Sequence, residues 1–424
     1  MSIDNNIIKF IFFLIPISLL SGSFFPDLLV SVLFVFLIFK NYKNKFLFLE
    51  NKFILFFFIF YLIIISSVIL VSPAPIIKQG TSIFYFRFGF FSLALYYFFY
   101  TNENIFNLSR IIFFIFTALI IDSLIQFYFG KNILGIKVTP TRLSSFFGDE
   151  LIMGSFISKI FPINLIFISL LKLDNNKKTF LYLLVFIFSL FLIFLSGERT
   201  SLGMFLFQVF FIFILSKYNF YKKLKLFFIF LLFLLSSLFI IDKFNSEKSI
   251  LIYKIKSSLG RFEHGFKNYV SLKNDKFKII PSHKGHYVTA YNIYRDHKFF
   301  GAGIKSFRYF CNNDKYRYDE NSCSTHPHNI VLLFISELGL IGFFIYTFFL
   351  IFLVTDILRN YLKRNSNEVD VNGYNRFIFI SIGIISTILP ILPNGNFFNN
   401  YMSIMFYLLM GYYLFLRKNI YKKN

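Results

Sequence analysis

The sequence contains no tryptophan, only two cysteines and few acids, with 21 Asp and Glu against 44 Lys and Arg in 424 residues. Two cysteines can form one disulfide at most, which excludes a disulfide-rich scaffold. In a soluble protein, the formal net charge of +23 would suggest a nucleic-acid partner. Here most cations lie in the connections between apolar runs, so no nucleic-acid partner is expected.

The chain also lacks a soluble domain of ordinary size once its apolar runs are set aside. Hydrophobic residues make up 56% of the sequence, and several runs approach or exceed the roughly 18 apolar residues of a membrane-spanning helix. The composition therefore predicts an all-α, polytopic membrane protein. The first apolar run, residues 7–20, is followed at once by a second run and by no small-residue cleavage site, so we expect no cleavable signal peptide.

About twelve membrane-spanning helices are predicted, and the fourth is the weakest because Arg87 interrupts it. Three regions result: an N-terminal bundle of about nine spans at 1–242, a long polar loop at 243–327, and a C-terminal bundle of about three spans at 328–424. The predicted spans cover residues 5–21, 24–39, 53–72, 80–100, 110–129, 151–171, 179–195, 200–216, 226–242, 328–356, 376–392 and 401–416.

The distribution of cations predicts the orientation. Twenty Lys and Arg residues fall in one set of alternate connections and the C-terminal tail, and five fall in the opposite short connections. Because cytoplasmic loops carry an excess of these residues, both termini are expected in the cytoplasm and the long loop outside, in the periplasm of a two-membrane cell. Within that loop, residues 285–300 have the spacing of an amphipathic helix that Gly301 would stop.

Both cysteines, Cys311 and Cys323, lie in the long loop. An even number of cysteines in an external segment predicts a disulfide. A metal site that adds the nearby His326 and His328 as ligands is the alternative. The spacing Cys-x11-Cys followed by His-x-His is not a common zinc pattern, so we expect the disulfide and no metal.

Four arginines outside the apolar runs are candidate phosphate ligands, because Arg carries a planar fork of donors that suits phosphate oxygens. Arg199 lies in a very short external turn, where an interfacial arginine that reaches the water layer is the alternative. Arg142 lies in another external loop and is either a second phosphate ligand or an ion-pair partner of nearby acids. Arg261 and Arg308 in the long loop are further candidates, with solvated side chains as the alternative.

His328 is the candidate general base, since an unperturbed imidazole titrates near neutral pH and can accept a proton from a hydroxyl nucleophile. His326 could do the same, but we expect Pro327 to point the two rings in different directions, so that one faces the site. A capping arrangement with Asn329 at the start of the next span is the alternative. Glu337, nine residues after His328, is expected to pair inside the helix bundle.

The histidine segment resembles a known signature. His328 and Asn329 are followed after nine residues by Gly339 and after two more by Gly342, which is similar to the His-Asn-x9-Gly-x-x-Gly signature of the O-antigen ligases. The following threonine of that family is Phe343 here. From the residues alone, we interpret the two glycines as close-packing positions between helices.

Three further segments are similar to motifs of the wider O-antigen ligase and polymerase superfamily. Residues 196–199, Ser-Gly-Glu-Arg, resemble its Ser-x-Arg turn. Residues 296–307 resemble its Asp-His-Pro-Leu-x-Gly-x-Gly-x-x-x-Phe segment, with lysine in place of the proline, and residues 142–149 resemble its Arg-x-x-Gly-x-Phe-Gly loop. The resemblance covers about residues 140–350 and includes the order of loops and spans.

The resemblance implies a glycosyltransferase of the bacterial inner (cytoplasmic) membrane that uses neither a metal nor another cofactor. It would move a glycan from undecaprenyl pyrophosphate to an acceptor hydroxyl. Arg199 corresponds to the family's pyrophosphate-binding arginine and His328 to its catalytic histidine, while the second family arginine is either Arg308 or Arg261. The implied partners are a lipid-linked glycan donor, a glycolipid or glycan acceptor, and membrane lipids.

Three functions remain open from the sequence. An O-antigen ligase and a polysaccharide polymerase would use the same donor and differ in the acceptor. A transporter or flippase is the third, but it would be expected to carry polar residues or broken helices at midspan. Here the polar candidates gather at the external boundary, which favours the two enzymes.

Overall fold

The computed structural model describes residues 6–42, 52–71, 80–100, 102–138, 142–217, 260, 283–365 and 369–420. These residues form helices and connecting loops, with a single isolated bridge between Lys131 and Lys137 and no strand. The predicted all-α class is confirmed. The helices are α1 (Asn6–Ser18), α2 (Phe24–Tyr42), α3 (Lys52–Val71), α4 (Gly80–Ile83), α5 (Phe86–Phe98), α6 (Asn102–Phe129), α7 (Met153–Leu170), α8 (Asn175–Ser196), α9 (Arg199–Leu215), α12 (Lys284–Asp296), α13 (Phe307–Phe310), α14 (Ile330–Lys363), α15 (Val371–Thr387) and α16 (Asn400–Lys418).

Five of the described helices are long and apolar enough to cross a membrane, namely α3, α6, α7, α8 and α14. Three shorter apolar helices lie in α1, α2 and α9. The molecule is therefore a helical membrane protein. The ninth predicted span, 226–242, and the part of the long loop before residue 283, except residue 260, lie outside the described residues, so the count of twelve and the division into three regions stay predictions.

The fourth predicted span is broken in two. A turn after Ile83 separates α4 from α5, and Arg87 lies in the first turn of α5. Its guanidinium is buried and forms an ion pair with Asp27 of α2, with Nη2 2.7 Å from Oδ1. A buried arginine needs such a partner. Arg87, which weakened the prediction of this span, thus forms an ion pair that joins α5 to α2.

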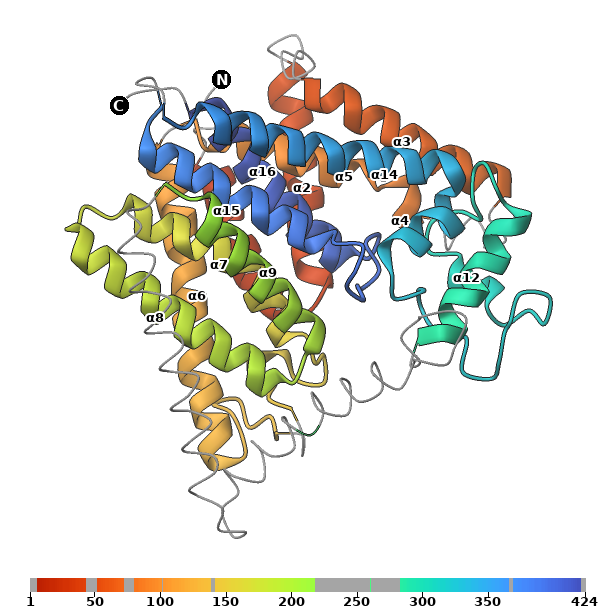
Figure 1. The fold of residues 1–424 in the computed structure, drawn as a ribbon, viewed down its shortest axis with the longest axis horizontal. Coiled ribbons are helices and arrows are strands. Elements are labelled where there is room, and N and C mark those ends of the chain that lie inside the picture. The colour runs from red at the N-terminus through yellow and green to blue at the C-terminus, as the bar shows by residue number, and fades with distance from the viewer. Residues whose placement is uncertain are drawn as a thin grey trace.

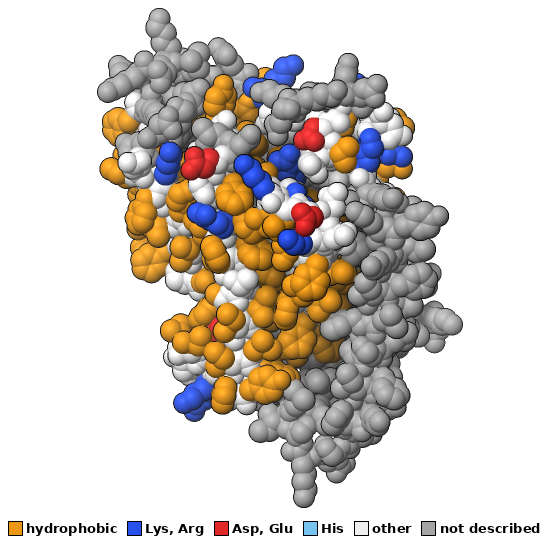
Figure 2. Space-filling model, turned by 90° about the vertical axis from the view of Figure 1, so that its left-hand side faces the viewer, with side chains coloured by type: hydrophobic (Ala, Val, Ile, Leu, Met, Phe, Trp, Pro, Cys, Tyr) orange, Lys and Arg blue, Asp and Glu red, His pale blue; other side chains and the backbone are white. Residues whose placement is uncertain are grey.

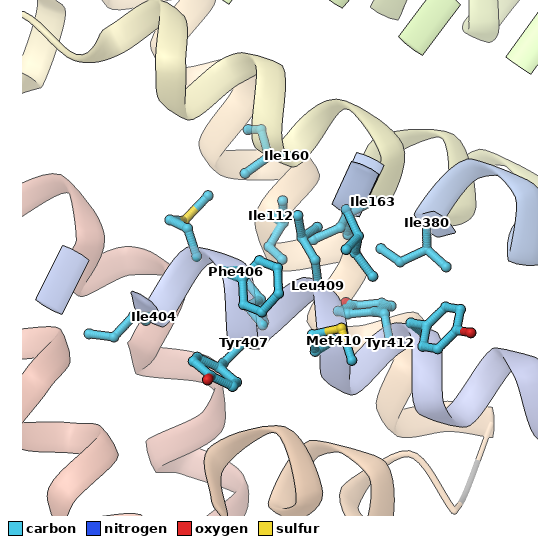
Figure 3. Close-up of a cluster of buried hydrophobic side chains, with 14 of the residues drawn as sticks. Ile112, Ile160, Ile163, Ile380, Ile404, Phe406, Tyr407, Leu409, Met410 and Tyr412 are labelled. Atoms are coloured by element: carbon cyan, nitrogen blue, oxygen red, sulfur yellow. The ribbon is translucent and has the colours of Figure 1, made fainter. Parts of the chain in front are cut away.

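The core of the bundle surrounds α16. Nearly every residue of this helix is buried, as expected for a helix that is apolar on all sides. Figure 3 shows Leu409 and Tyr412 of α16 close to Ile112 of α6 and Ile163 of α7. In Figure 1, α16 runs beneath α14 and beside α15 and α5. Helices α14, α15 and α16 are therefore held by one continuous apolar core, whereas α12 packs in a separate, smaller cluster.

The outer face of the bundle is also apolar. Along α14, Phe344, Phe348 and Ile351 are 64%, 61% and 55% exposed, and their spacing of three and four residues places them on one side of the helix. Figure 2 shows a continuous area of hydrophobic side chains, with Lys and Arg gathered toward one end of the view. An exposed apolar area of this kind is what lipid contact requires.

The described part of the long loop, residues 283–327, folds at one end of the bundle (Figure 1). Figure 1 shows α12 and the segment that follows it on the side opposite the N and C termini. The predicted helix 285–300 is found as Lys284–Asp296, so its end was placed four residues too late. The remaining residues, with Gly301 at φ +68°, leave the helix because they dock against α14 through their backbone.

That docking explains the glycines at positions 301 and 339, where an added Cβ would overlap the backbone of the partner segment. Gly339 has φ +66° and ψ −161° and interrupts α14. At the break, Leu340 N–H donates to Lys298 O at 2.8 Å, and Gly303 N–H donates to Glu337 O at 2.9 Å. A Cβ on Gly339 would overlap the carbonyl group of Phe299. Gly339 therefore packs against a loop, and its interpretation as a packing position between helices was wrong.

We expect Gly339→Ala to displace the docked loop and lower the melting temperature, because the added methyl group has no space and the backbone conformation is one that glycine adopts. Gly135→Ala is the matched control: Gly135 also has a positive φ of +80°, but nothing lies within 4 Å of its added Cβ. The measurement is the melting temperature of both variants in detergent. Equal shifts would contradict the docking role of Gly339.

Candidate active site

Four of the six histidines of the chain meet where α12 begins and α14 begins. The ring of His328 lies with its centroid 4.1 Å from His326, 4.8 Å from His283 and 5.1 Å from His286. The sequence motifs singled out His326 and His328 but missed His283 and His286. Their spacing of three residues at the start of a predicted helix indicates a shared face, yet nothing local indicates that this face meets His328.

His326 is fixed by its neighbours. Its Nε2 lies 3.0 Å from the carbonyl oxygen of Asn394, in the loop between α15 and α16. A carbonyl oxygen only accepts, so Nε2 carries the proton and Nδ1 accepts from Thr325 Oγ1 at 2.8 Å. Burial lowers the pKa of His326 to about 4, although the hydrogen bond to Asn394 opposes this shift. Both nitrogens of this neutral ring are therefore occupied.

His328 is held by its backbone instead. The Asn394 N–H donates to His328 O at 3.0 Å, and the side chain of Asn329 caps α14 by accepting from two backbone N–H groups. Within the part of the chain that the structure describes, neither ring nitrogen of His328 has a hydrogen-bond partner. The two rings lie side by side, contrary to the expectation that Pro327 would point them apart, but only His328 keeps a free nitrogen lone pair.

The pKa values of His328 and His283 are both lowered. Burial lowers the pKa of His328 to about 3, and the neighbouring imidazoles add to this effect. The pKa of His283 is also lowered, mainly by burial, then by His286 and by the charge of Arg199. Burial therefore favours the neutral form of His283, His326 and His328. Because the charge of Arg199 acts on His283, the turn 196–201 lies near this histidine.

The turn that carries Arg199 is anchored by Glu198. The carboxylate of Glu198 accepts from the N–H groups of Gly154 and Ser155, at 2.6 and 3.0 Å, at the start of α7. A carboxylate at a helix N-terminus is stabilised by the helix dipole and satisfies free backbone donors. Because Glu198 faces α7, the adjacent Arg199 begins α9 with an exposed side chain.

Arg308 approaches the histidines from the docked loop. The carboxylate of Glu337 accepts from the backbone N–H groups of Lys305 at 2.8 Å and Phe307 at 3.3 Å, and so fixes the start of α13. Glu337 thus holds a loop, where the sequence predicted a pairing within the bundle. The charge of Arg308 adds to the effect of burial in lowering the pKa of His326. Burial also lowers the pKa of Lys305 to about 8, and the charges of Arg308 and Arg87 add to that shift.

The other predicted site residues differ in their placement. Arg142 precedes Leu143, whose N–H donates to Leu195 O at 3.1 Å, so its backbone lies beside the end of α8 and near the turn of Arg199. Arg261 lies outside the described residues. Cys311 and Cys323 form a disulfide, with Cα atoms 4.9 Å apart, that closes the segment before the histidines.

An apolar pocket opens between α3, α14 and α16, below the start of α14. All of its lining side chains are hydrophobic or aromatic. Phe334 of α14 lines this pocket only six residues after His328. The polar cluster and the apolar pocket are therefore neighbours along one helix. The pocket is lined by Phe53, Phe56, Phe57, Phe60, Phe334, Ile345, Tyr346, Phe349, Ile388, Phe397, Phe406, Tyr407 and Met410.

The fold and site define a helical membrane protein with a cluster of histidines and arginines at one end of its bundle. Residues 184–347 match a family model described as O-antigen ligase, and this segment belongs to that family. The matched segment contains Arg199, Arg308 and all four clustered histidines. The resemblance seen in the sequence motifs is confirmed. Among curated proteins, no match to the chain was found.

Proposed function

We propose that this protein is a glycosyltransferase that moves a glycan from undecaprenyl pyrophosphate to an acceptor hydroxyl. The observation that carries the proposal is that His328, with its free ring nitrogen, lies beside His283, whose pKa is lowered in part by the charge of Arg199. A lipid-linked donor needs cations at the membrane surface and an apolar path for its chain. Arg199 and Arg308 supply the cations, and the aromatic pocket beside Phe334 supplies an apolar surface for the polyprenyl chain.

In the proposed reaction, the acceptor hydroxyl gives its proton to His328 as its oxygen attacks the anomeric carbon of the donor sugar. The bond between that carbon and the diphosphate oxygen breaks, and its electron pair leaves with the diphosphate. Arg199 and Arg308 stabilise this charge through charge-assisted hydrogen bonds, so the step needs no metal. The bound diphosphate also favours the protonated imidazole, which opposes the lowering of the His328 pKa by burial.

The proposal places the histidine cluster outside the cytoplasm of a bacterial inner membrane. It rests on the excess of Lys and Arg in one set of alternate connections between the predicted spans and in the C-terminal tail. A reporter that is active only outside the cytoplasm, fused after Asn424, should be silent, while the same reporter inserted after Asn313 in the exposed loop should be active. Activity of the C-terminal fusion would contradict the orientation.

Ligase and polymerase activity are distinguished by the acceptor, a lipid core or a second lipid-linked glycan. We favour the ligase because the matched family is described as O-antigen ligase. In a deletion strain, a ligase defect is expected to remove the whole polymer ladder from the lipid core while lipid-linked polymer accumulates. Cores that carry a single repeat would show a polymerase instead. An unchanged glycolipid profile would contradict both.

A further inference from the structure

The three imidazoles of His283, His286 and His328 form a group that the proposed transfer reaction does not need in full. One ring nitrogen from each lies within 4.8 Å of the other two. His283 and His286 belong to the start of α12, at a spacing of three residues, and His328 precedes α14. Two independent segments thus bring three imidazole nitrogens to one point, and imidazole is a common ligand of zinc, copper and nickel.

Hydrogen bonding assigns the free nitrogen of His286. Its Nδ1 lies 2.9 Å from the carbonyl oxygen of Ser322. The carbonyl accepts, so Nδ1 carries the proton and Nε2 keeps the lone pair. A histidine that donates its other N–H to a backbone carbonyl is the usual arrangement of a metal ligand, since the bond fixes the tautomer and orients the ring. Nδ1 of His283 is buried and has no partner among the described residues.

The distances show a site that is partly formed. Two metal–nitrogen bonds of about 2.1 Å span roughly 4.2 Å at most. The three nitrogens lie within 4.8 Å of one another, so the side chains must rotate to bring all three into contact with one ion. The charge of Arg199, which acts on His283, disfavours a cation here, so we expect binding that is readily reversed.

We propose that His283, His286 and His328 bind one divalent metal ion of the zinc class, and that this ion inhibits glycan transfer. The inhibition rests on the proposed function, in which His328 is the base. A neutral imidazole has one lone pair, which either binds the metal or accepts a proton. A metal on His328 and proton transfer to His328 therefore exclude each other. Three histidine ligands leave a fourth position open for water.

The test of the site uses Co²⁺ as the probe, with the full chain in detergent, a purification tag free of histidine and prior removal of metals with EDTA. We expect visible absorption bands that saturate at one Co²⁺ per chain and are abolished by Zn²⁺. His283→Ala and His286→Ala should each weaken Co²⁺ binding at least tenfold. His326→Ala is the matched control, because its ring lies in the same cluster but both of its nitrogens are occupied.

No Co²⁺ binding by the parent chain, or binding that both His283→Ala and His286→Ala leave unchanged, overturns the site. The inhibition is tested separately, as the ratio of transfer rates with and without Zn²⁺ for each protein. The parent should slow at least tenfold at saturating Zn²⁺, whereas His286→Ala should keep a ratio near one at the same concentration. If the parent binds one Co²⁺ per chain but transfers glycan at the same rate with and without Zn²⁺, the proposed inhibition is refuted. A parent that transfers no glycan at all contradicts the proposed function, while the Co²⁺ titration still decides the site.

Discussion

His328→Ala is expected to reduce glycan transfer by roughly 10²- to 10⁴-fold, the usual contribution of a positioned general base. Binding of the lipid-linked donor should remain, because in the proposed reaction the diphosphate is held by the arginines. The measurement is transfer by purified protein in detergent, with donor binding determined separately. The structure makes this the sharper of the two histidine tests, because His328 keeps a free ring nitrogen and His326 does not.

His297→Ala serves as the control for the loss of a partly buried imidazole. His297 follows α12 and packs on Phe310, with ring centroids 5.1 Å apart, away from the cluster. We expect the His297→Ala variant to transfer glycan at the parent's rate when both proteins are assayed below their melting temperatures. His326→Ala should be milder than His328→Ala. Normal transfer by His328→Ala together with an inactive His326→Ala would assign the base to the wrong histidine, and activity of both would refute the base mechanism.

Arg199→Lys is expected to weaken donor binding by roughly 10- to 100-fold, since a hydrogen bond to a charged group contributes about 1.5–3 kcal/mol. Lysine keeps the charge but cannot reproduce the planar pair of donors that binds two phosphate oxygens together. Glu198 holds the turn on α7 independently of this side chain, so the fold should be unchanged. Isothermal titration with undecaprenyl pyrophosphate measures the effect.

Arg295→Lys is the matched control for Arg199→Lys. Arg295 is exposed in the last turn of α12, so the same substitution there changes the surface without touching the proposed diphosphate site. Its donor affinity should equal that of the parent. If Arg308→Lys weakens binding while Arg199→Lys does not, the principal diphosphate ligand is Arg308. If neither variant weakens binding, the proposed diphosphate site is refuted.

Much of the architecture could be predicted from short-range features of the sequence. Apolar runs predicted the helices because a membrane-spanning helix satisfies its backbone hydrogen bonds within its own segment. The order of four short motifs predicted the family, since motif spacing needs no knowledge of contacts. Errors arose where a segment distant in sequence changes the local structure. The helix predicted at 285–300 ends earlier, because its last predicted residues form backbone hydrogen bonds with the break at Gly339.

The sequence by itself determined that this chain is a helical membrane protein with a segment similar to the O-antigen ligases, and it singled out Arg199 and His328. Only the tertiary structure decided what surrounds them. It placed His283 and His286 beside His328, brought the carbonyl oxygen of Asn394 to Nε2 of His326, and turned Glu337 toward a loop backbone. The physical reason is that each of these arrangements joins segments brought together by helix packing, whereas local patterns report only which residues share a helix face or a turn.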